Sequence, residues 1–114
     1  MLRKVGQAEL TALARRVVQA LADLEPQAIW LFGSYARGEV DEWSDLDLAV
    51  VLPTELPFSE RGRLVRSRLG GLGLAVECLV YTPEEFARLA REPRGVLHSI
   101  LTEGVRLDAI AAAR

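Results

Sequence analysis

The sequence predicts one small domain of the α/β (α+β) class, with a mixed sheet of three to four strands flanked by helices. Stretches with apolar residues at helical spacing alternate along the chain with short runs of branched apolar residues. Hydrophobic residues make up 50% of the 114 residues, which is enough to bury a core. Because no repeat, low-complexity tract or linker interrupts the chain, we expect residues 1–114 to form a single domain.

The first half of the chain predicts a helix, a strand and a short second helix. An apolar stripe predicts a helix over residues 6–24, and Pro26 ends it. The stripe consists of Leu10, Leu13, Ala14, Val17, Val18, Leu21 and Leu24. The apolar run at residues 28–32 is typical of a buried strand. Residues 34–37 then predict the start of a short helix, and residues 38–43 predict a polar turn or loop.

The middle of the chain predicts a strand, a helix and a second strand. Residues 46–52 are rich in branched apolar side chains, as buried strands are. A helix is expected over residues 59–69, with Ser59 as its N-cap and the glycine pair at 70–71 as its stop. Residues 74–81 predict the next strand.

The last third begins with a strong helix signal. Residues 82–85 combine a capping threonine, a proline at the first helical position and two acids in the first turn. Pro93 is expected to end this helix. A further helix is predicted over residues 95–103, and residues 105–107 predict a last edge strand.

Composition excludes several broad classes of function. The formal net charge is -2 and both signs are spread along the chain, which argues against general nucleic-acid binding. Cys78 is the single cysteine, so no intrachain disulfide can form, and a reducing compartment is favoured. No stretch is long and apolar enough for a membrane span or a signal peptide. We therefore expect a cytoplasmic protein that does not contact membranes.

The segment Gly-Ser-Tyr-Ala-Arg-Gly at residues 33–38 predicts a phosphate-binding turn. Backbone N–H groups at Gly33 and Ser34 precede a helix, where the helix dipole favours an anion. The Ser34 hydroxyl can donate to a phosphate oxygen, and Arg37 lies one turn later. A surface ion pair is the alternative role for Arg37. The turn is not a Walker A loop, because the lysine and its glycine spacing are absent.

Two carboxylates follow this turn. Asp45 and Asp47 are two positions apart, and on a strand such side chains share one face. Neighbouring acids repel each other and raise their pKa values, whereas Mg²⁺ relieves this repulsion and prefers oxygen ligands. Two Mg²⁺ ions about 4 Å apart can activate a nucleophile and stabilise a leaving pyrophosphate. The pattern therefore predicts metal-dependent chemistry on a nucleoside triphosphate.

A third acid, Glu77, lies within the strand predicted at residues 74–81. Apolar residues surround it in the sequence, and an acid there is costly unless it is paired or metal-bound. If this strand lies beside the strand of Asp45 and Asp47, Glu77 completes a carboxylate triad and can accept the proton of an attacking hydroxyl. The alternative is an edge-strand acid that faces solvent.

Together these residues resemble the signature of the DNA polymerase beta-like nucleotidyltransferase superfamily. The similarity is carried by Gly33-Ser34, Arg37-Gly38, Ser44-Asp45 and Asp47. Given its length, the chain is most similar to the minimal nucleotidyltransferases of bacteria and archaea. Close similarity covers residues 30–51, and a looser one continues through Glu77 and residues 81–85.

The resemblance implies a nucleotidyltransferase fold and a set of ligands. Asp45 and Asp47 would ligate two Mg²⁺ ions, and Glu77 would be the third carboxylate, where the family usually has aspartate. Gly33, Ser34 and Arg37 would bind an NTP, by default ATP. The resemblance further implies transfer of a nucleoside monophosphate to a hydroxyl with release of pyrophosphate. Family members of this size are often the antitoxin of a helical HEPN-domain toxin, and some transfer AMP to a tyrosine of that partner, so a protein acceptor is expected.

Two other functions stay open. The chain could neutralise a helical partner by masking it, with little or no catalysis, or it could need a second polypeptide to complete its site. The apolar stripe of Leu97, Ile100 and Leu101 predicts core packing, with an oligomer or partner surface as the alternative. Core packing is also expected for Cys78, and for Tyr35 and Trp43, with stacking on a nucleobase as the alternative for these two rings. The arginines at 61, 63, 66 and 68 predict a solvated helix face, with a grip on an acidic partner or on the phosphates of the nucleotide as the alternative.

Overall fold

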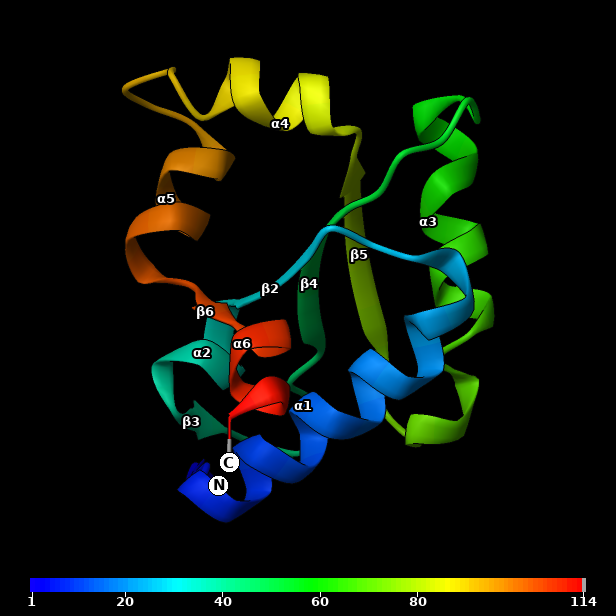
Figure 1. The fold of residues 1–114 in the computed structure, drawn as a ribbon. Helices are drawn as coiled ribbons and strands as arrows, with labels where there is room; N and C mark the ends of the chain where they lie inside the picture. Colours follow the sequence, from blue (N-terminus) through cyan, green and yellow to red (C-terminus); the bar gives the residue numbers. More distant parts are fainter. Residues whose placement is uncertain (114) are drawn as a thin grey trace.

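The fold is built on a four-stranded mixed sheet, seen in a computed structural model that describes residues 1–113 (Figure 1). The strand order is β5-β4-β2-β6. The strands are β2 (Ala28–Phe32), β4 (Leu46–Val51), β5 (Val76–Tyr81) and β6 (Val105–Arg106). Strand β2 pairs antiparallel with β4 and β6, whereas β4 and β5 are parallel. This confirms the predicted mixed sheet of three to four strands.

One face of the sheet packs against the larger of two apolar clusters. It is covered by α1 (Gln7–Leu21), α3 (Phe58–Ser67) and α6 (Leu107–Ala112). Alternation along the strands places Leu31, Leu48 and Val50 on this face, and each is almost fully buried. Helix α1 supplies its predicted stripe and lies beside α6 (Figure 1). This face therefore holds the main core.

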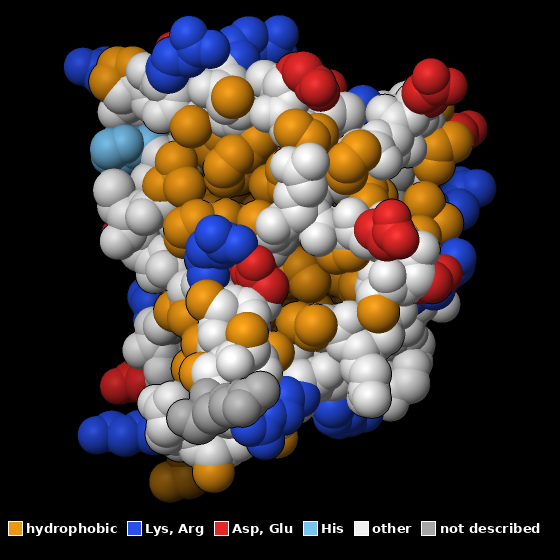
Figure 2. Space-filling view, in the orientation of Figure 1, with side chains coloured by type: hydrophobic (Ala, Val, Ile, Leu, Met, Phe, Trp, Pro, Cys, Tyr) orange, Lys and Arg blue, Asp and Glu red, His pale blue; other side chains and the backbone are white. Residues whose placement is uncertain are grey.

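The other face carries a smaller apolar cluster. It is covered by α4 (Pro83–Leu89) and α5 (Val96–Glu103), both of which are short. Ala49 and Tyr81 are buried here together with Leu97 and Ile100 of α5. Around them lie Trp30, Phe32, Leu79, Phe86, Leu89 and Leu101, all only partly buried. Figure 2 shows hydrophobic side chains open to view in the region framed by α4 and α5.

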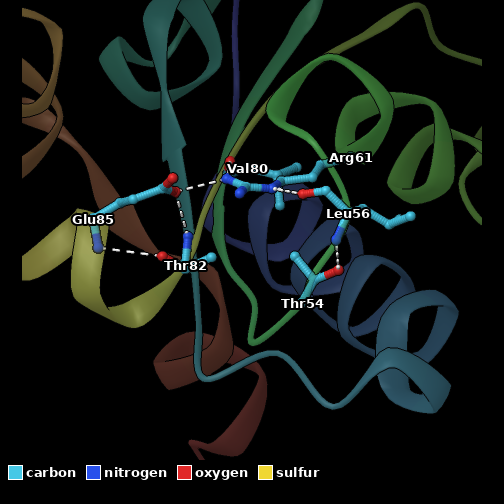
Figure 3. Close-up of polar contacts among 6 residues, drawn as sticks. All are labelled: Thr54, Leu56, Arg61, Val80, Thr82 and Glu85. Carbon is cyan, nitrogen blue, oxygen red and sulfur yellow. Dashed lines mark hydrogen bonds and ion pairs between the residues drawn. The ribbon is translucent and has the colours of Figure 1, made fainter.

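A polar network fixes the start of α4 (Figure 3). The Thr82 hydroxyl accepts from the Glu85 N–H at 3.2 Å, and a Glu85 carboxylate oxygen accepts from the Thr82 N–H at 2.8 Å. The buried Arg61 guanidinium donates to the same Glu85 oxygen at 2.6 Å and to the Leu56 carbonyl at 2.8 Å. The capping box predicted from residues 82–85 is confirmed. Its ion pair with Arg61 joins α4 to α3.

Three elements were not predicted: the strands β1 (Arg3–Lys4) and β3 (Glu39–Val40) and the helix α6. The expected loop over residues 38–43 contains β3, which pairs antiparallel with β1. Strands of two residues carry no periodic signal, so only their pairing reveals them. The predicted last strand over residues 105–107 includes Leu107, but helix α6 begins at that residue. The Leu107 side chain packs in the main core.

Some predicted boundaries are wrong. Ser59 does not cap α3, because the helix begins at Phe58 and extended backbone at Pro57 precedes it. Strand β5 starts at Val76 rather than at residue 74, and the glycine pair at 70–71 belongs to a 3₁₀ turn, Gly70–Leu72. Helix α4 ends at Leu89, before Pro93. Within residues 1–113, none of the helices is long and apolar enough to cross a membrane.

Candidate functional site

The site begins where β2 passes into α2 (Gly33–Arg37). Gly33 has φ +73°, a left-handed conformation that favours glycine. A β-carbon on Gly33 would overlap the Asp47 carboxylate oxygen Oδ2 and lie 3.3 Å from the Asp47 Cβ. The register of the sheet explains this closeness, because Phe32 pairs with Asp47. The predicted turn therefore lies directly against one of the predicted carboxylates.

The rest of α2 places its polar side chains outward. Tyr35 is buried in the main core, while Arg37 is exposed and Ser34 is half-buried. Gly38, with φ +85°, ends the helix. In the part of the chain that the structure describes, Arg37 takes part in none of the five ion pairs. Its charge instead acts on Asp47, where it only partly offsets the burial and the neighbouring negative charges that raise the pKa of that carboxyl.

The three predicted carboxylates lie at one end of the sheet. Asp47 on β4 is in register with Glu77 on the parallel strand β5, so the two side chains share a face. Asp45 lies just before β4 and is exposed. Burial raises the pKa of Asp47, and the negative charges of Glu77 and Asp45 raise it further. The structure thus brings Asp45, Asp47 and Glu77 into one electrostatic neighbourhood.

The donor set fits a divalent metal by its chemistry. Carboxylate oxygens are the ligands that Mg²⁺ prefers, and a cation would offset the repulsion felt by Asp47. Among residues 1–113, however, no group of three or more His, Cys, Asp and Glu side chains lies close enough together to hold one ion. Asp45 and Glu77 are both exposed, and their side chains would have to move to gather around Asp47.

A hollow of about 440 Å³ opens beside Glu77. It is lined by Phe32, Arg66, Glu77, Cys78, Leu79 and Val96. Arg66 comes from α3, where Gly62 leaves room for it: a β-carbon on Gly62 would lie 3.0 Å from Arg66 Nη1. The hollow therefore offers apolar walls, one cation and the third carboxylate. Arg66 is exposed, as the predicted solvated helix face requires, and the packing of α3 against β5 places it beside Glu77.

Four other residues test expectations drawn from the sequence. Cys78 packs against the main core, and burial raises the pKa of its thiol to about 11, so it is a structural residue. Tyr35 is 5% exposed, as expected for core packing. Trp43 is 82% exposed, so the expectation that it packs in the core is wrong. In the arginine run, Arg61 also departs from the predicted solvated face because it is buried.

Comparisons with known proteins show which family of domains the chain is similar to. A family model described as nucleotidyltransferase domain matches residues 14–102. A curated relative, the "Probable protein adenylyltransferase MntA" of Haemophilus influenzae, is 34% identical over 58 residues. The match covers 51% of this chain and 49% of the relative, so the chain spans about half the length of that relative.

Solved structures share the fold. A minimal nucleotidyltransferase is 28% identical with a TM-score of 0.60, and the match covers 87% of this chain and 93% of that chain. A toxin–antitoxin solved with AMP-PNP is 22% identical with a TM-score of 0.60, covering 86% and 80% of the two chains. A nucleotidyltransferase from Sulfolobus solfataricus is 23% identical with a TM-score of 0.57, covering 88% and 80%. The predicted fold class is confirmed.

Proposed function

Because the chain belongs to the nucleotidyltransferase domain family, whose model matches residues 14–102, we propose that it transfers AMP from ATP to a hydroxyl group and releases pyrophosphate. We propose that it acts as the antitoxin of a toxin–antitoxin pair and that the hydroxyl belongs to a helical HEPN-type partner. The observation that carries this proposal is the position of Asp47, against the turn at Gly33 and in register with Glu77. The shared fold with a toxin–antitoxin solved with AMP-PNP supports the setting.

The three carboxylates would hold the metal. Asp45 and Asp47 would bind two Mg²⁺ ions, and Glu77 would add the third carboxylate. The chemistry that Mg²⁺ supplies when bound is charge neutralisation on the triphosphate and stabilisation of the leaving pyrophosphate. The support for this assignment is the mutual repulsion that already raises the pKa of Asp47.

The remaining groups would position the substrates. The Gly33 and Ser34 backbone and the Ser34 hydroxyl would hold the triphosphate, and Arg37 would face its negative charge. The acceptor hydroxyl would form a bond to the α-phosphorus as the bond to the β-phosphate oxygen breaks. Glu77 would take the proton of that hydroxyl, since it borders the hollow in which an acceptor would lie.

Transfer of label tests the proposal. The gene for the proposed partner is sought as a neighbouring gene that encodes a small all-helical protein. The chain is incubated with α-³²P-labelled ATP, Mg²⁺ and that protein. We expect the helical protein to become labelled with wild type and to stay unlabelled with Asp45→Asn. Asp23→Asn is the matched control. Asp23 is a surface acid that forms an ion pair with Arg68 and is not one of the candidate site residues. Absence of label with wild type, or equal label with Asp45→Asn, would refute transfer.

A masking module is the second candidate function. Two observations favour it: Glu77 is exposed, and the described residues gather no group of three metal-binding side chains. A masking antitoxin would neutralise its helical partner without nucleotide. Neutralisation of toxicity in cells by Asp45→Asn at the wild-type level, with no label on the partner, would select this function over transfer.

A further inference from the structure

We propose that Trp43 stacks on the nucleobase of the bound NTP and gives the site a preference for purines. This inference rests on the proposed function and adds to it a base-binding residue. It comes from three features of the structure: the exposure of the ring, the rigidity of the loop that carries it, and its place in the chain next to Asp45.

The first feature is exposure. Trp43 is 82% exposed, more than any other aromatic side chain in residues 1–113, and Phe58 follows at 51%. An indole ring is among the largest apolar groups that a protein can bury, so leaving it in water forgoes much stabilisation. A ring left so fully in solvent beside a candidate site is available to a ligand.

The second feature is the loop. The Asp41 carboxylate oxygen Oδ1 accepts from the Trp43 N–H at 2.9 Å and from the Ser44 hydroxyl at 3.2 Å. The Ser44 hydroxyl oxygen in turn accepts from the Asp41 N–H at 2.9 Å. These bonds hold the backbone of Trp43 in place without engaging its ring. Stacking would therefore order only the side-chain torsions of Trp43, because its backbone is already hydrogen-bonded in place.

The third feature is position. Trp43 is two residues before Asp45, so their Cα atoms lie at most about 7.6 Å apart. A nucleotide with its phosphates at the carboxylates extends its base away from them, within reach of a side chain as long as tryptophan. Among the other aromatic side chains, Phe32 lines the hollow beside Glu77 but is only partly exposed. Tyr35 is buried in the core, and the Arg106 guanidinium lies 5.9 Å from the Trp30 ring centroid. Trp43 is therefore the most exposed aromatic side chain close in the chain to the carboxylates.

Stacking has a recognisable specificity. Stacking depends on the area of the base more than on its hydrogen-bonding edge. It therefore does not distinguish adenine from guanine, but it favours these larger rings over a pyrimidine. We therefore expect adenine and guanine nucleotides to bind with similar affinity, and uracil nucleotides to bind more weakly.

Binding measurements with and without a base test the proposal. AMP-PNP and inorganic tripolyphosphate, each with Mg²⁺, are titrated into wild type and Trp43→Ala by calorimetry. Loss of one stacking contact corresponds to a roughly 5- to 100-fold weaker Kd for AMP-PNP. The Kd for tripolyphosphate should not change, because this ligand has no base. Trp43→Phe should restore most of the affinity for AMP-PNP.

Fluorescence gives a second readout. The chain has two tryptophans, so Trp30→Phe leaves Trp43 as the only indole. We expect AMP-PNP and the equivalent guanine nucleotide to quench its emission and tripolyphosphate to leave it unchanged.

Three results would overturn the inference. Equal AMP-PNP affinity in wild type and Trp43→Ala would show that Trp43 does not stack on the base. Equal weakening of AMP-PNP and tripolyphosphate would show that Trp43 shapes the loop instead. If neither ligand binds to wild type, the proposed function fails as well. In the other two results wild type still binds nucleotide, so only the inference about Trp43 fails.

Discussion

The Asp47 carboxylate fills the space that a side chain on Gly33 would need. A β-carbon on Gly33 would overlap Asp47 Oδ2, and Gly33 also adopts φ +73°. The glycine is therefore required twice, once for the backbone conformation and once for the contact. This relationship joins the two halves of the motif, since the turn after β2 and the acid on β4 touch across the antiparallel pair.

Substitution of Gly33 should separate these two requirements. Gly33→Ala is expected to lose the roughly 1–2 kcal/mol that a left-handed conformation costs a non-glycine residue, and to lose more because Asp47 must move. Gly38→Ala is the matched control: Gly38 has φ +85°, but nothing lies within 4 Å of its β-carbon position. Urea denaturation should show a larger loss for Gly33→Ala. Equal losses would mean that the Asp47 contact is unimportant.

Removing one of the facing acids should stabilise the protein without metal. Asp47 and Glu77 are cross-strand neighbours of like charge, and their repulsion raises the pKa of Asp47. Glu77→Gln should therefore raise the free energy of unfolding in EDTA by about 0.2–1 kcal/mol. Glu84→Gln, at an exposed acid away from this pair, should have little effect. A destabilised Glu77→Gln would contradict the arrangement of the site.

The Arg61–Glu85 pair should make stability depend on pH in the acid range. The hydrogen bond from Arg61, followed by that from the Thr82 N–H, lowers the pKa of Glu85 below 4.5. A lowered folded-state pKa means that the stabilisation is complete above about pH 4.5 and is lost as pH falls through the folded value. The difference in unfolding free energy between wild type and Glu85→Gln should shrink as the pH falls below 4.5. If this difference did not change with pH, the Arg61–Glu85 pair would not be the source of the stabilisation.

The thiol of Cys78 should react slowly in the folded protein. Burial raises its pKa from 9.0 to about 11, and the thiolate is the reactive form. At pH 8, a disulfide reagent such as DTNB should modify the folded chain at least about tenfold more slowly than the chain unfolded in guanidinium. Equal rates would show that Cys78 is accessible and ionised, contrary to its place against the main core.

Much of the fold could be predicted because local signals and tertiary packing agree. The stripe of α1 and the capping box at Thr82 are both encoded within a few turns of chain. The pairing of β1 with β3 could not be predicted, because two-residue strands are defined only by a partner distant in the sequence. Helix α6 was missed for a similar reason, since Leu107 is anchored by the core rather than by a local pattern.

The candidate site, like the fold, could be predicted from the sequence only in part. The spacing of Asp45 and Asp47 and the turn at Gly33 are sequence features, and their identification needed no structure. The neighbourhood of Asp47 and Glu77 depends on which strands are adjacent and in what register, which spacing alone does not determine. The exposure of Trp43 likewise depends on the loop turning away from the core.

Metal binding tests the central claim most directly. Mn²⁺ substitutes for Mg²⁺ at oxygen ligands and can be counted by electron paramagnetic resonance in the presence of AMP-PNP. We expect wild type and Asp23→Asn to bind Mn²⁺ equally, and Asp45→Asn and Asp47→Asn to bind it at least about tenfold more weakly. Wild-type Mn²⁺ affinity in both Asp45→Asn and Asp47→Asn would contradict the claim that these carboxylates form the metal site.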